Sequence, residues 1–591
     1  MSRPVAGLLC GLAYLACLSI FLPFLPTAIG TMGHDYGLHL PNMLAGYYWF
    51  LHNGVGILPW FSPAQCGGFP YFPDPNVAYL SLPQALVILM SPVRAIQVTF
   101  CLFALIALCG AYGLMRVGFG TSRAAAVLAA GLFVFNGFFI YRVLIGHLTF
   151  HAFALAPLMV LMLLPVGRAP EPVLARLGRI CVAGLCLAYM FQSGMVHGIP
   201  PVLLATAVIL LVHALRFGWR WEPWLRLAAA GLLSLLLCAG KLTAELALLA
   251  HFPRDQYPLP GVPDFLLLLR MVAQMLFVSV PADPNAQLAN TMWPFERNEW
   301  EYGVSIVPAL LLVVAVVVGL VHRRRWKPLS GHRILMLLAI AMLLACPLLL
   351  NWHAPVWTGF LKSLPYFGNS SSLLRFFCAY IPVVIVLASL ALDGIPWPEA
   401  ARPRLCTASA VLCLGGVVLQ NALTERDYYA GQPYQSKPIE AAYARARATG
   451  VVPPIEAIVD TDRFMVMSND AMIAGGSQLD CYQPLLGYRR EKFPVAPLRL
   501  GRVDQTVSGV LNLKNPACYL FGAENQCRPG DHFTLAQAAD AEAFRNYRPF
   551  AFAQPLWQRL ATWTSLLAAA ITLVVLLMWG LVRRRAATPG A

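Results

Sequence analysis

Long apolar runs recur along the whole chain and are separated by short polar stretches. Of the 591 residues, 59% are hydrophobic and only 12% are charged, whereas a typical soluble domain has roughly one-quarter charged residues. A helix needs about 20 apolar residues to cross the hydrocarbon core of a bilayer. The sequence therefore predicts a mainly α-helical, polytopic membrane protein.

Twelve of the apolar runs predict transmembrane helices. They lie near residues 5–29, 95–115, 124–141, 151–167, 180–196, 198–215, 227–249, 303–321, 334–350, 373–392, 405–422 and 562–582. Two further apolar pieces, residues 78–90 and 265–280, are expected to lie in the outer interface, the second with a re-entrant path as its alternative.

The basic residues alternate in density from one side of this map to the other. The predicted inside segments hold 19 Lys and Arg residues, whereas the outside loops before residue 423 hold seven. Cytoplasmic loops are enriched in Lys and Arg, so both ends of the chain are predicted to be cytoplasmic. The net charge of +15 is thus spread over loops and forms no basic patch, which argues against nucleic-acid binding.

The composition changes abruptly after the eleventh predicted span, where charged residues, Gly and Pro become frequent. About 135 residues are enough for a small core, so residues 423–559 predict a soluble α/β outer domain. The rest of the map is a transmembrane module over residues 1–422, with its first outer loop at 31–94. A final helix and a cytoplasmic tail occupy residues 560–591.

Three cysteines lie in the predicted outer domain. Cys518 and Cys527 have a spacing that a disulfide within a hairpin can close in an oxidising compartment. Cys481 is left over in this interpretation. A metal site is the weaker alternative for the pair, because no His or further Cys lies at ligand spacing.

Asp35 is the strongest candidate for a catalytic group. It follows the first span closely, and an ionisable group near membrane depth usually faces a cavity and marks a functional site. A partly desolvated carboxylate is expected to have a raised pKa and to act as a base. The alternative is that Asp35 caps the helix predicted to begin at Tyr36.

A transferase that works at this face on a lipid-linked donor would also need cations to hold the phosphate that leaves. Arg375 follows a Ser-rich stretch near the outer end of a span, and a guanidinium binds phosphate oxygens well. Lys241 and Arg254 are further candidates. Arg375 could instead only extend to the interface, and Lys241 could pair with Glu245 four residues later.

Other polar residues near the outer face complete the predicted site. His34, His39 and Glu301 are expected to contact substrate, with helix capping as the alternative for Glu301. His147 and His151 lie four residues apart, but a core or hydrogen-bonded role is preferred over metal ligation. Asp74 lies between two prolines and predicts a turn.

Several short stretches carry a resemblance to a known family: Asp35 with residues 58–63 (LPWFSP) and 67–70 (GGFP) in the first loop, and residues 300–303 (WEYG) and 372–376 (SLLRF) further along. Together with a soluble outer domain before one last span, they resemble the YfhO-like bacterial membrane proteins in the GT-C glycosyltransferase superfamily. The resemblance implies that Asp35 is the catalytic base and that the donor is a polyprenyl-phosphate sugar. Many relatives carry a second acidic residue beside the first, whereas here the neighbours are His34 and Tyr36, which leaves the use of Mg²⁺ or Mn²⁺ open.

These features predict an inverting glycosyltransferase of the bacterial inner membrane. Its donor would be a polyprenyl-phosphate-linked sugar, and its acceptor a glycan, lipid or protein on the periplasmic side. One alternative is a multispan transporter or flippase, which would need charged or broken-helix sites near the middle of the membrane. The other is a non-catalytic envelope assembly factor that tolerates substitution of Asp35.

Overall fold

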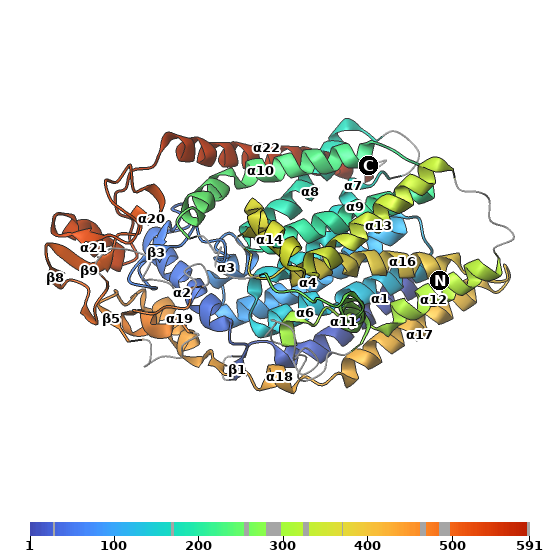
Figure 1. Ribbon diagram of the computed structural model, residues 1–591, viewed down its shortest axis with the longest axis horizontal. Coiled ribbons are helices and arrows are strands. Elements are labelled where there is room, and N and C mark those ends of the chain that lie inside the picture. Colours follow the sequence, from blue (N-terminus) through green and yellow to red (C-terminus); the bar gives the residue numbers. More distant parts are fainter. Residues whose placement is uncertain are drawn as a thin grey trace.

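The computed structural model of the chain describes residues 1–27, 30–166, 171–252, 259–278, 297–322, 330–368, 370–460, 468–483 and 497–587. The protein is mainly helical and elongated, with the membrane helices side by side along the long axis and most of the short strands gathered toward one end (Figure 1). The predicted α-helical class is therefore confirmed.

Ten helices in the described part of the chain are long and apolar enough to cross a membrane. Their main segments are α1 (Arg3–Phe21), α4 (Pro92–Gly113), α5 and α6 together (Arg123–Val134 and Gly137–Ile145), α8 (Val173–Gln192), α9 (Ile199–Phe217), α10 (Glu222–Leu249), α13 (Gly331–Asn351), α16 (Tyr380–Gly394), α17 (Arg402–Leu423) and α22 (Leu556–Ala587). Each matches one predicted span, and the chain is a multi-pass membrane protein.

The remaining two predicted spans are shorter helices. Residues 151–167 fall on the 3₁₀ segment η3 (Leu148–Leu155) and on α7 (Ala156–Leu163), and residues 303–321 fall on α12 (Ile306–Val321). Because α7 has eight residues, it rises only about 12 Å as a helix. The count of twelve therefore stays a prediction. The two interfacial pieces contain α3 (Leu82–Val87) and α11 (Phe265–Phe277).

The span made of α5 and α6 lies at the centre of the bundle, and its apolar window is completely buried. Helix α5 is rich in Ala and Gly, and small side chains let membrane helices approach closely. Asn136 separates the two helices: its side chain accepts a hydrogen bond from the backbone N–H of Phe139 at 2.9 Å and so starts α6. Helix α6 then ends against the first loop, to which it presents the residues after Ile145.

The first loop and the segment predicted as the outer domain, for which we keep that name, together form the end of the molecule that carries most of the strands (Figure 1). The loop contributes α2 (Tyr36–Asn53) and the hairpin of β2 (Phe61–Ser62) and β3 (Phe69–Pro70). The outer domain contributes α18 (Asp427–Ala430), α19 (Lys437–Thr449), α20 (Cys518–Phe521), α21 (Ala538–Arg545), a mixed sheet β6-β5-β7 (Gly476–Gln478, Ala457–Val459, Gly501–Arg502) and an antiparallel sheet β10-β9-β8 (His532–Thr534, Val510–Lys514, Thr506–Val507).

The outer domain is joined directly to the first loop. Strand β1 (Thr31–Met32) pairs antiparallel with β4 (Tyr434–Gln435) in the register Thr31 to Gln435. The buried apolar side chains of both segments belong to one continuous cluster that also includes the membrane helices. The start of the outer domain therefore fixes the chain just before Asp35.

Two disulfides are present among the described cysteines. The bond between Cys518 and Cys527 confirms the predicted pair. The interpretation of Cys481 as left over is wrong, because it bonds to Cys66 of the first loop, 415 residues earlier in the chain. A spacing rule within one segment cannot reveal a partner that only the tertiary fold brings near.

Candidate functional site

Asp35 lies where the first loop crosses the end of α6. Its backbone N–H donates to the carbonyl of Ile145 at 3.3 Å. Gly146, which follows Ile145 at the end of α6, has φ +110°, and a Cβ there would lie 2.5 Å from the backbone nitrogen of Tyr36. Only glycine accepts both this conformation and this approach without strain. Gly146 therefore allows Asp35 and the residue after it, His147, to meet.

The Asp35 carboxylate is almost enclosed, with 7% of the residue exposed. The Nε2 atom of His147 contacts Oδ2, and the phenol of Tyr482 donates a hydrogen bond to Oδ1. Nε2 of His34 lies 3.5 Å from Oδ1. Helix α2 begins at Tyr36 as predicted, but the Asp35 side chain makes no capping hydrogen bond. Helix capping therefore does not account for the carboxylate.

His147 links the carboxylate to a buried guanidinium. Nη1 of Arg142 lies 3.1 Å from Nδ1 of His147. A guanidinium has only donors, so Nδ1 must accept this hydrogen bond and Nε2 must carry the proton that faces Asp35. These contacts place His147 between the two charged groups, with its Nε2 proton facing Asp35.

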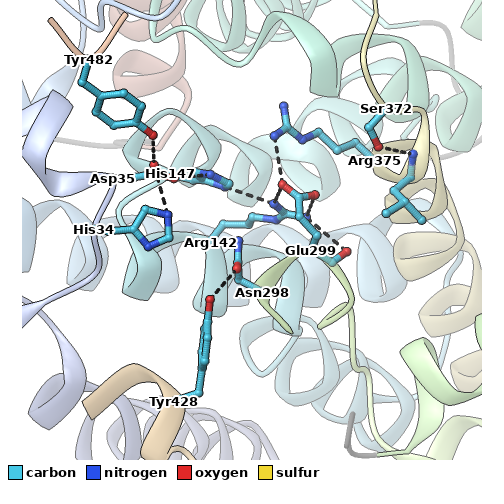
Figure 2. A network of polar contacts seen from close by, with 11 residues as sticks. His34, Asp35, Arg142, His147, Asn298, Glu299, Ser372, Arg375, Tyr428 and Tyr482 are labelled. Atoms are coloured by element: carbon cyan, nitrogen blue, oxygen red, sulfur yellow. Dashed lines mark hydrogen bonds and ion pairs between the residues drawn. The ribbon is translucent and has the colours of Figure 1, made fainter. Parts of the chain in front are cut away.

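The chain of contacts continues from Arg142 to Arg375 (Figure 2). Glu299 binds Arg142 through both carboxylate oxygens, at 2.6 and 2.7 Å, and Nη2 of Arg375 lies 3.1 Å from Oε1 of Glu299. The Arg142 side chain is fully buried, whereas that of Arg375 is 26% exposed. We call Asp35, His147, Arg142, Glu299 and Arg375 the Asp35–Arg375 network.

Aromatic rings enclose the cations of the network. The guanidinium of Arg142 lies 5.4, 5.7 and 5.9 Å from the ring centres of Phe138, Phe150 and Tyr302, and that of Arg375 lies 5.0 Å from Phe150. These distances permit cation–π attraction. The network therefore runs from a closed interior to a more open edge at Arg375.

The electrostatics of the two carboxylates differ from the expectation of a raised pKa. Burial raises the pKa of Asp35, but His147, His34 and Tyr482 together outweigh burial and hold the pKa below its usual range. Burial likewise raises the pKa of Glu299, and the two guanidinium groups hold it well below the ordinary value. The predicted raised pKa of Asp35 is therefore wrong for this arrangement, and both groups are ionised at neutral pH.

His34 and His39 both lie near the carboxylate, and their predicted contact with substrate stays a prediction. His34 also contacts Oε1 of Gln432 through Nδ1 at 3.1 Å. His39, in α2, is buried, and burial lowers its pKa to about 4 despite the attraction of Asp35. Arg375 belongs to the network by its contact with Glu299.

The structure does not bring the other predicted residues into the network. Nζ of Lys241 donates to the carbonyls of Val77 and Gln192, at 3.1 and 3.3 Å, and lies 3.6 Å from Glu245. Glu301 binds Arg297 at 2.9 Å and accepts a hydrogen bond from Tyr429. Arg254 lies outside the described residues.

Two predicted structural roles, those of Asp74 and His151, are confirmed. Oδ1 of Asp74 accepts a hydrogen bond from the backbone N–H of Asn76 at 2.7 Å, as in an Asx turn. His151 does not share a site with His147, because its ring nitrogens contact the carbonyl of Leu148 at 2.5 Å and the hydroxyl of Tyr189 at 2.7 Å.

Four network or neighbouring residues were not predicted as site residues: Arg142, His147, Glu299 and Tyr482. Arg142 and His147 flank the glycine that ends α6, and an Arg inside an apolar run is itself a signal of function. Glu299 is an acidic residue just ahead of a predicted span, a position that indicates function only weakly. Nothing in the sequence indicates a role for Tyr482, which is one of several tyrosines in the predicted outer domain.

A divalent cation was left open by the sequence. Across the described ranges, no group of three or more His, Cys, Asp or Glu side chains could hold a metal ion. The two oxygens of Asp35 already contact His147 and Tyr482. The residues in this arrangement do not fit a bound cation, so we derive no step through one.

No protein-family model matches this chain, and no curated protein matches it. Similar solved structures include the Archaeoglobus fulgidus oligosaccharyltransferase in the apo form, at TM-score 0.38 and 16% identity over 75% of this chain and 58% of that chain. Its complex with Zn and sulfate has TM-score 0.35 and 16% identity over 75% and 55% of the two chains. The archaeal oligosaccharyltransferase AglB from the same organism, in complex with an inhibitory peptide and a dolichol-phosphate, has TM-score 0.35 and 15% identity over 74% and 58%.

The aligned part spans little more than half of these oligosaccharyltransferase chains. At TM-scores below 0.5, the similarities assign neither a fold family nor an activity to this chain. The resemblance to the YfhO-like proteins and to the GT-C superfamily accordingly stays a prediction.

Proposed function

We propose that this chain is an inverting membrane glycosyltransferase of the GT-C type. It would transfer a sugar from a polyprenyl-phosphate-linked donor to a glycan, lipid or protein acceptor on the periplasmic side of the bacterial inner membrane. The observation that carries the proposal is the Asp35–Arg375 network, which connects a buried carboxylate to a partly exposed cation.

Asp35 serves as the general base in this proposal. The acceptor hydroxyl gives its proton to the carboxylate while its oxygen bonds to the anomeric carbon of the sugar. The bond from that carbon to the phosphate oxygen breaks, and polyprenyl phosphate leaves with the electron pair. A single displacement of this kind inverts the anomeric configuration.

The low pKa of Asp35 in the present arrangement depends on His147 and Tyr482, which hydrogen-bond to it, and on the nearby His34. Burial acts in the opposite direction, and an unpaired buried carboxylate is the stronger base. An acceptor hydroxyl that replaces one of the donors would therefore meet a carboxylate of higher pKa. Base strength would then develop when the acceptor binds.

Arg375 is the residue proposed to hold the phosphate. Its Nη2 contacts Glu299, its side chain is 26% exposed, and its Nε has no hydrogen-bond partner among the described residues. A guanidinium can bind two phosphate oxygens at once. Glu299, which also holds Arg142, fixes Arg375 in place.

The test is transfer from a defined donor. Membranes of a deletion strain, with and without the wild-type chain restored, are incubated with radiolabelled undecaprenyl-phosphate sugars. We expect label to enter a glycan, lipid or protein fraction only when the chain is present. The proposal fails if restoration changes neither this labelling nor the surface and lipid-linked glycans of the strain.

A further inference from the structure

The outer domain reaches the candidate site through a three-residue segment, residues 481–483. Each of the three makes a contact with the first loop. Cys481 is bonded to Cys66, the hydroxyl of Tyr482 donates to Asp35, and Nε2 of Gln483 donates to Oδ2 of Asp74 at 2.8 Å.

The backbone of Tyr482 is held from a second direction. Its N–H donates to Oδ1 of Asn469 at 2.8 Å, and its carbonyl accepts from Nδ2 of the same Asn469 at 2.9 Å. The backbone N–H of Asn469 in turn donates to the carbonyl of Gly37 at 2.9 Å, in the first turn of α2. Asn469 therefore ties Tyr482 to the helix that follows Asp35.

The disulfide is anchored on its other side as well. Gly67, next to Cys66, donates its N–H to Oγ of Ser477 at 2.9 Å, and its carbonyl accepts from the N–H of Lys514 at 2.8 Å. Cys66 and Cys481 are buried, at 6% and 4% exposure. The bond thus lies inside the junction of loop and outer domain.

We propose that Tyr482 is a positioning residue of the active site, supplied by the outer domain and kept in place by the Cys66–Cys481 disulfide. This inference deepens the proposed function and rests on it. The phenol holds one oxygen of Asp35 while His147 holds the other, so the carboxylate plane is fixed from two elements. The outer domain is then part of the catalytic centre.

The charged and titratable groups around Asp35 come from four elements. They are His34 in the first loop, His39 in α2, His147 and, behind it, Arg142 at the end of α6, and Tyr482 in the outer domain. A hydrogen bond to a charged group contributes about 1.5–3 kcal/mol, which equals about one to two pKa units. Loss of the phenol should thus raise the pH at which Asp35 binds a proton by about one to two units.

Carbodiimide labelling tests this shift without any donor or acceptor, because the reagent modifies the protonated carboxyl. The labelling rate of Asp35, relative to the exposed Asp264 at the start of α11 in the same sample, is followed by peptide mass spectrometry between pH 4 and 7 in the purified full chain. We expect Tyr482→Phe to raise the rate at a fixed pH by about ten-fold or more, since each pKa unit changes the protonated fraction ten-fold.

The disulfide is tested by a matched pair of variants. Cys66→Ser/Cys481→Ser should raise Asp35 labelling in the same direction as Tyr482→Phe. Cys518→Ser/Cys527→Ser removes the other bond of the same domain, whose cysteines lie nine residues apart, and should leave the rate within about two-fold, since it touches no partner of Asp35.

The inference is overturned if Asp35 is labelled at the same rate in Tyr482→Phe and in the wild type. The absence of labelling at Asp35 in both proteins counts as this result. It is also overturned if the two double variants behave alike. A chain that labels as expected but transfers no sugar would refute the proposed function alone. Transfer that needs Asp35, with an acid limb of its pH profile that Tyr482→Phe does not move, would refute this inference alone.

Discussion

Glu299 binds the guanidinium groups of Arg142 and Arg375. Its replacement by Gln would leave Arg142, the most deeply buried charge of the network, without a carboxylate partner. Arg142 has a fully buried side chain and binds both oxygens of Glu299, at 2.6 and 2.7 Å. Removal of one partner from a buried ion pair costs about 3–5 kcal/mol, because the other charge stays buried without compensation.

Two features of the structure place Glu299→Gln near the lower end of that range. The amide oxygen of Gln can still accept one hydrogen bond from Arg142. Three aromatic rings lie within 6 Å of the Arg142 guanidinium, and each contributes about 0.5–2 kcal/mol of cation–π attraction in either variant. We therefore expect a loss of about 3 kcal/mol in the free energy of unfolding.

The assay is equilibrium unfolding of the purified chain in mixed detergent micelles, with Glu425→Gln as the matched control. Glu425 also binds an arginine, Arg297, at 2.7 Å, but its side chain is 50% exposed. The Arg297 side chain is buried, but it keeps Glu301 at 2.9 Å when Glu425 is replaced. No buried charge is then left unpaired, so this variant should stay closer to the wild type than Glu299→Gln does.

A double variant separates an unpaired charge from a general packing defect. Glu299→Gln/Arg142→Gln removes both charges, and we expect it to be less destabilised than the sum of the two single variants by about 0.5–3 kcal/mol. Equal losses in Glu299→Gln and Glu425→Gln, or strict additivity in the double variant, would refute the account of Arg142 as a compensated buried charge.

Two further predictions concern the donor and the pH dependence of stability. Arg375→Gln should raise the donor KM by about 10–100-fold, since a charged hydrogen bond to phosphate contributes about 1.5–3 kcal/mol. Initial rates measured against donor concentration check this, with Arg270→Gln as the control because Arg270 is an exposed arginine of α11. An unchanged KM in Arg375→Gln would contradict the prediction. Asp470 accepts a hydrogen bond from Tyr434 at 2.8 Å, and burial raises its pKa to about 6. The native state then binds more protons than the unfolded chain between about pH 4 and 6, so wild-type stability should fall as the pH rises through this range, by about 2 kcal/mol. Asp470→Asn should lack that slope in unfolding experiments from pH 4.5 to 8, and a parallel slope in the variant would contradict the assignment.

The features that could be predicted from the sequence depend on short segments. Apolar runs of about 20 residues locate the helices of the bundle, and the ten long helices each match one. The start of α2 at Tyr36 and the Cys518–Cys527 bond are also local, and both are found in the structure. Asp35 stood out because a charge so close to an apolar run needs a reason.

The rest of the site depends on contacts between distant segments. Tyr482 and Asp35 are 447 residues apart, and no spacing rule joins them. The partner of Cys481 is hidden for the same reason. The predicted direction of the Asp35 pKa was wrong because the prediction counted only burial, which a local sequence indicates. It did not include His147, His34 and Tyr482, which the fold brings to the carboxylate.

Span length shows a second limit of the sequence. Apolar residues continue through η3 and α7, but the first eight form 3₁₀ turns beside the candidate site and only the last eight are α-helical. Hydropathy reports that a segment is buried in an apolar environment, and it does not report which helix the backbone adopts there.

The measurement that tests the central claim most directly is sugar transfer by the Asp35→Asn variant from a radiolabelled undecaprenyl-phosphate donor. Asp74→Asn is the matched control, since Asp74 is also a buried carboxylate of the first loop but contacts Asn76 and Gln483 instead of the network. Loss of a general base lowers the rate by about 10²–10⁴-fold. We predict such a loss in Asp35→Asn, with normal folding and insertion, and transfer by Asp74→Asn within a few-fold of the wild type. Full transfer by Asp35→Asn would contradict the assignment of Asp35 as the catalytic base.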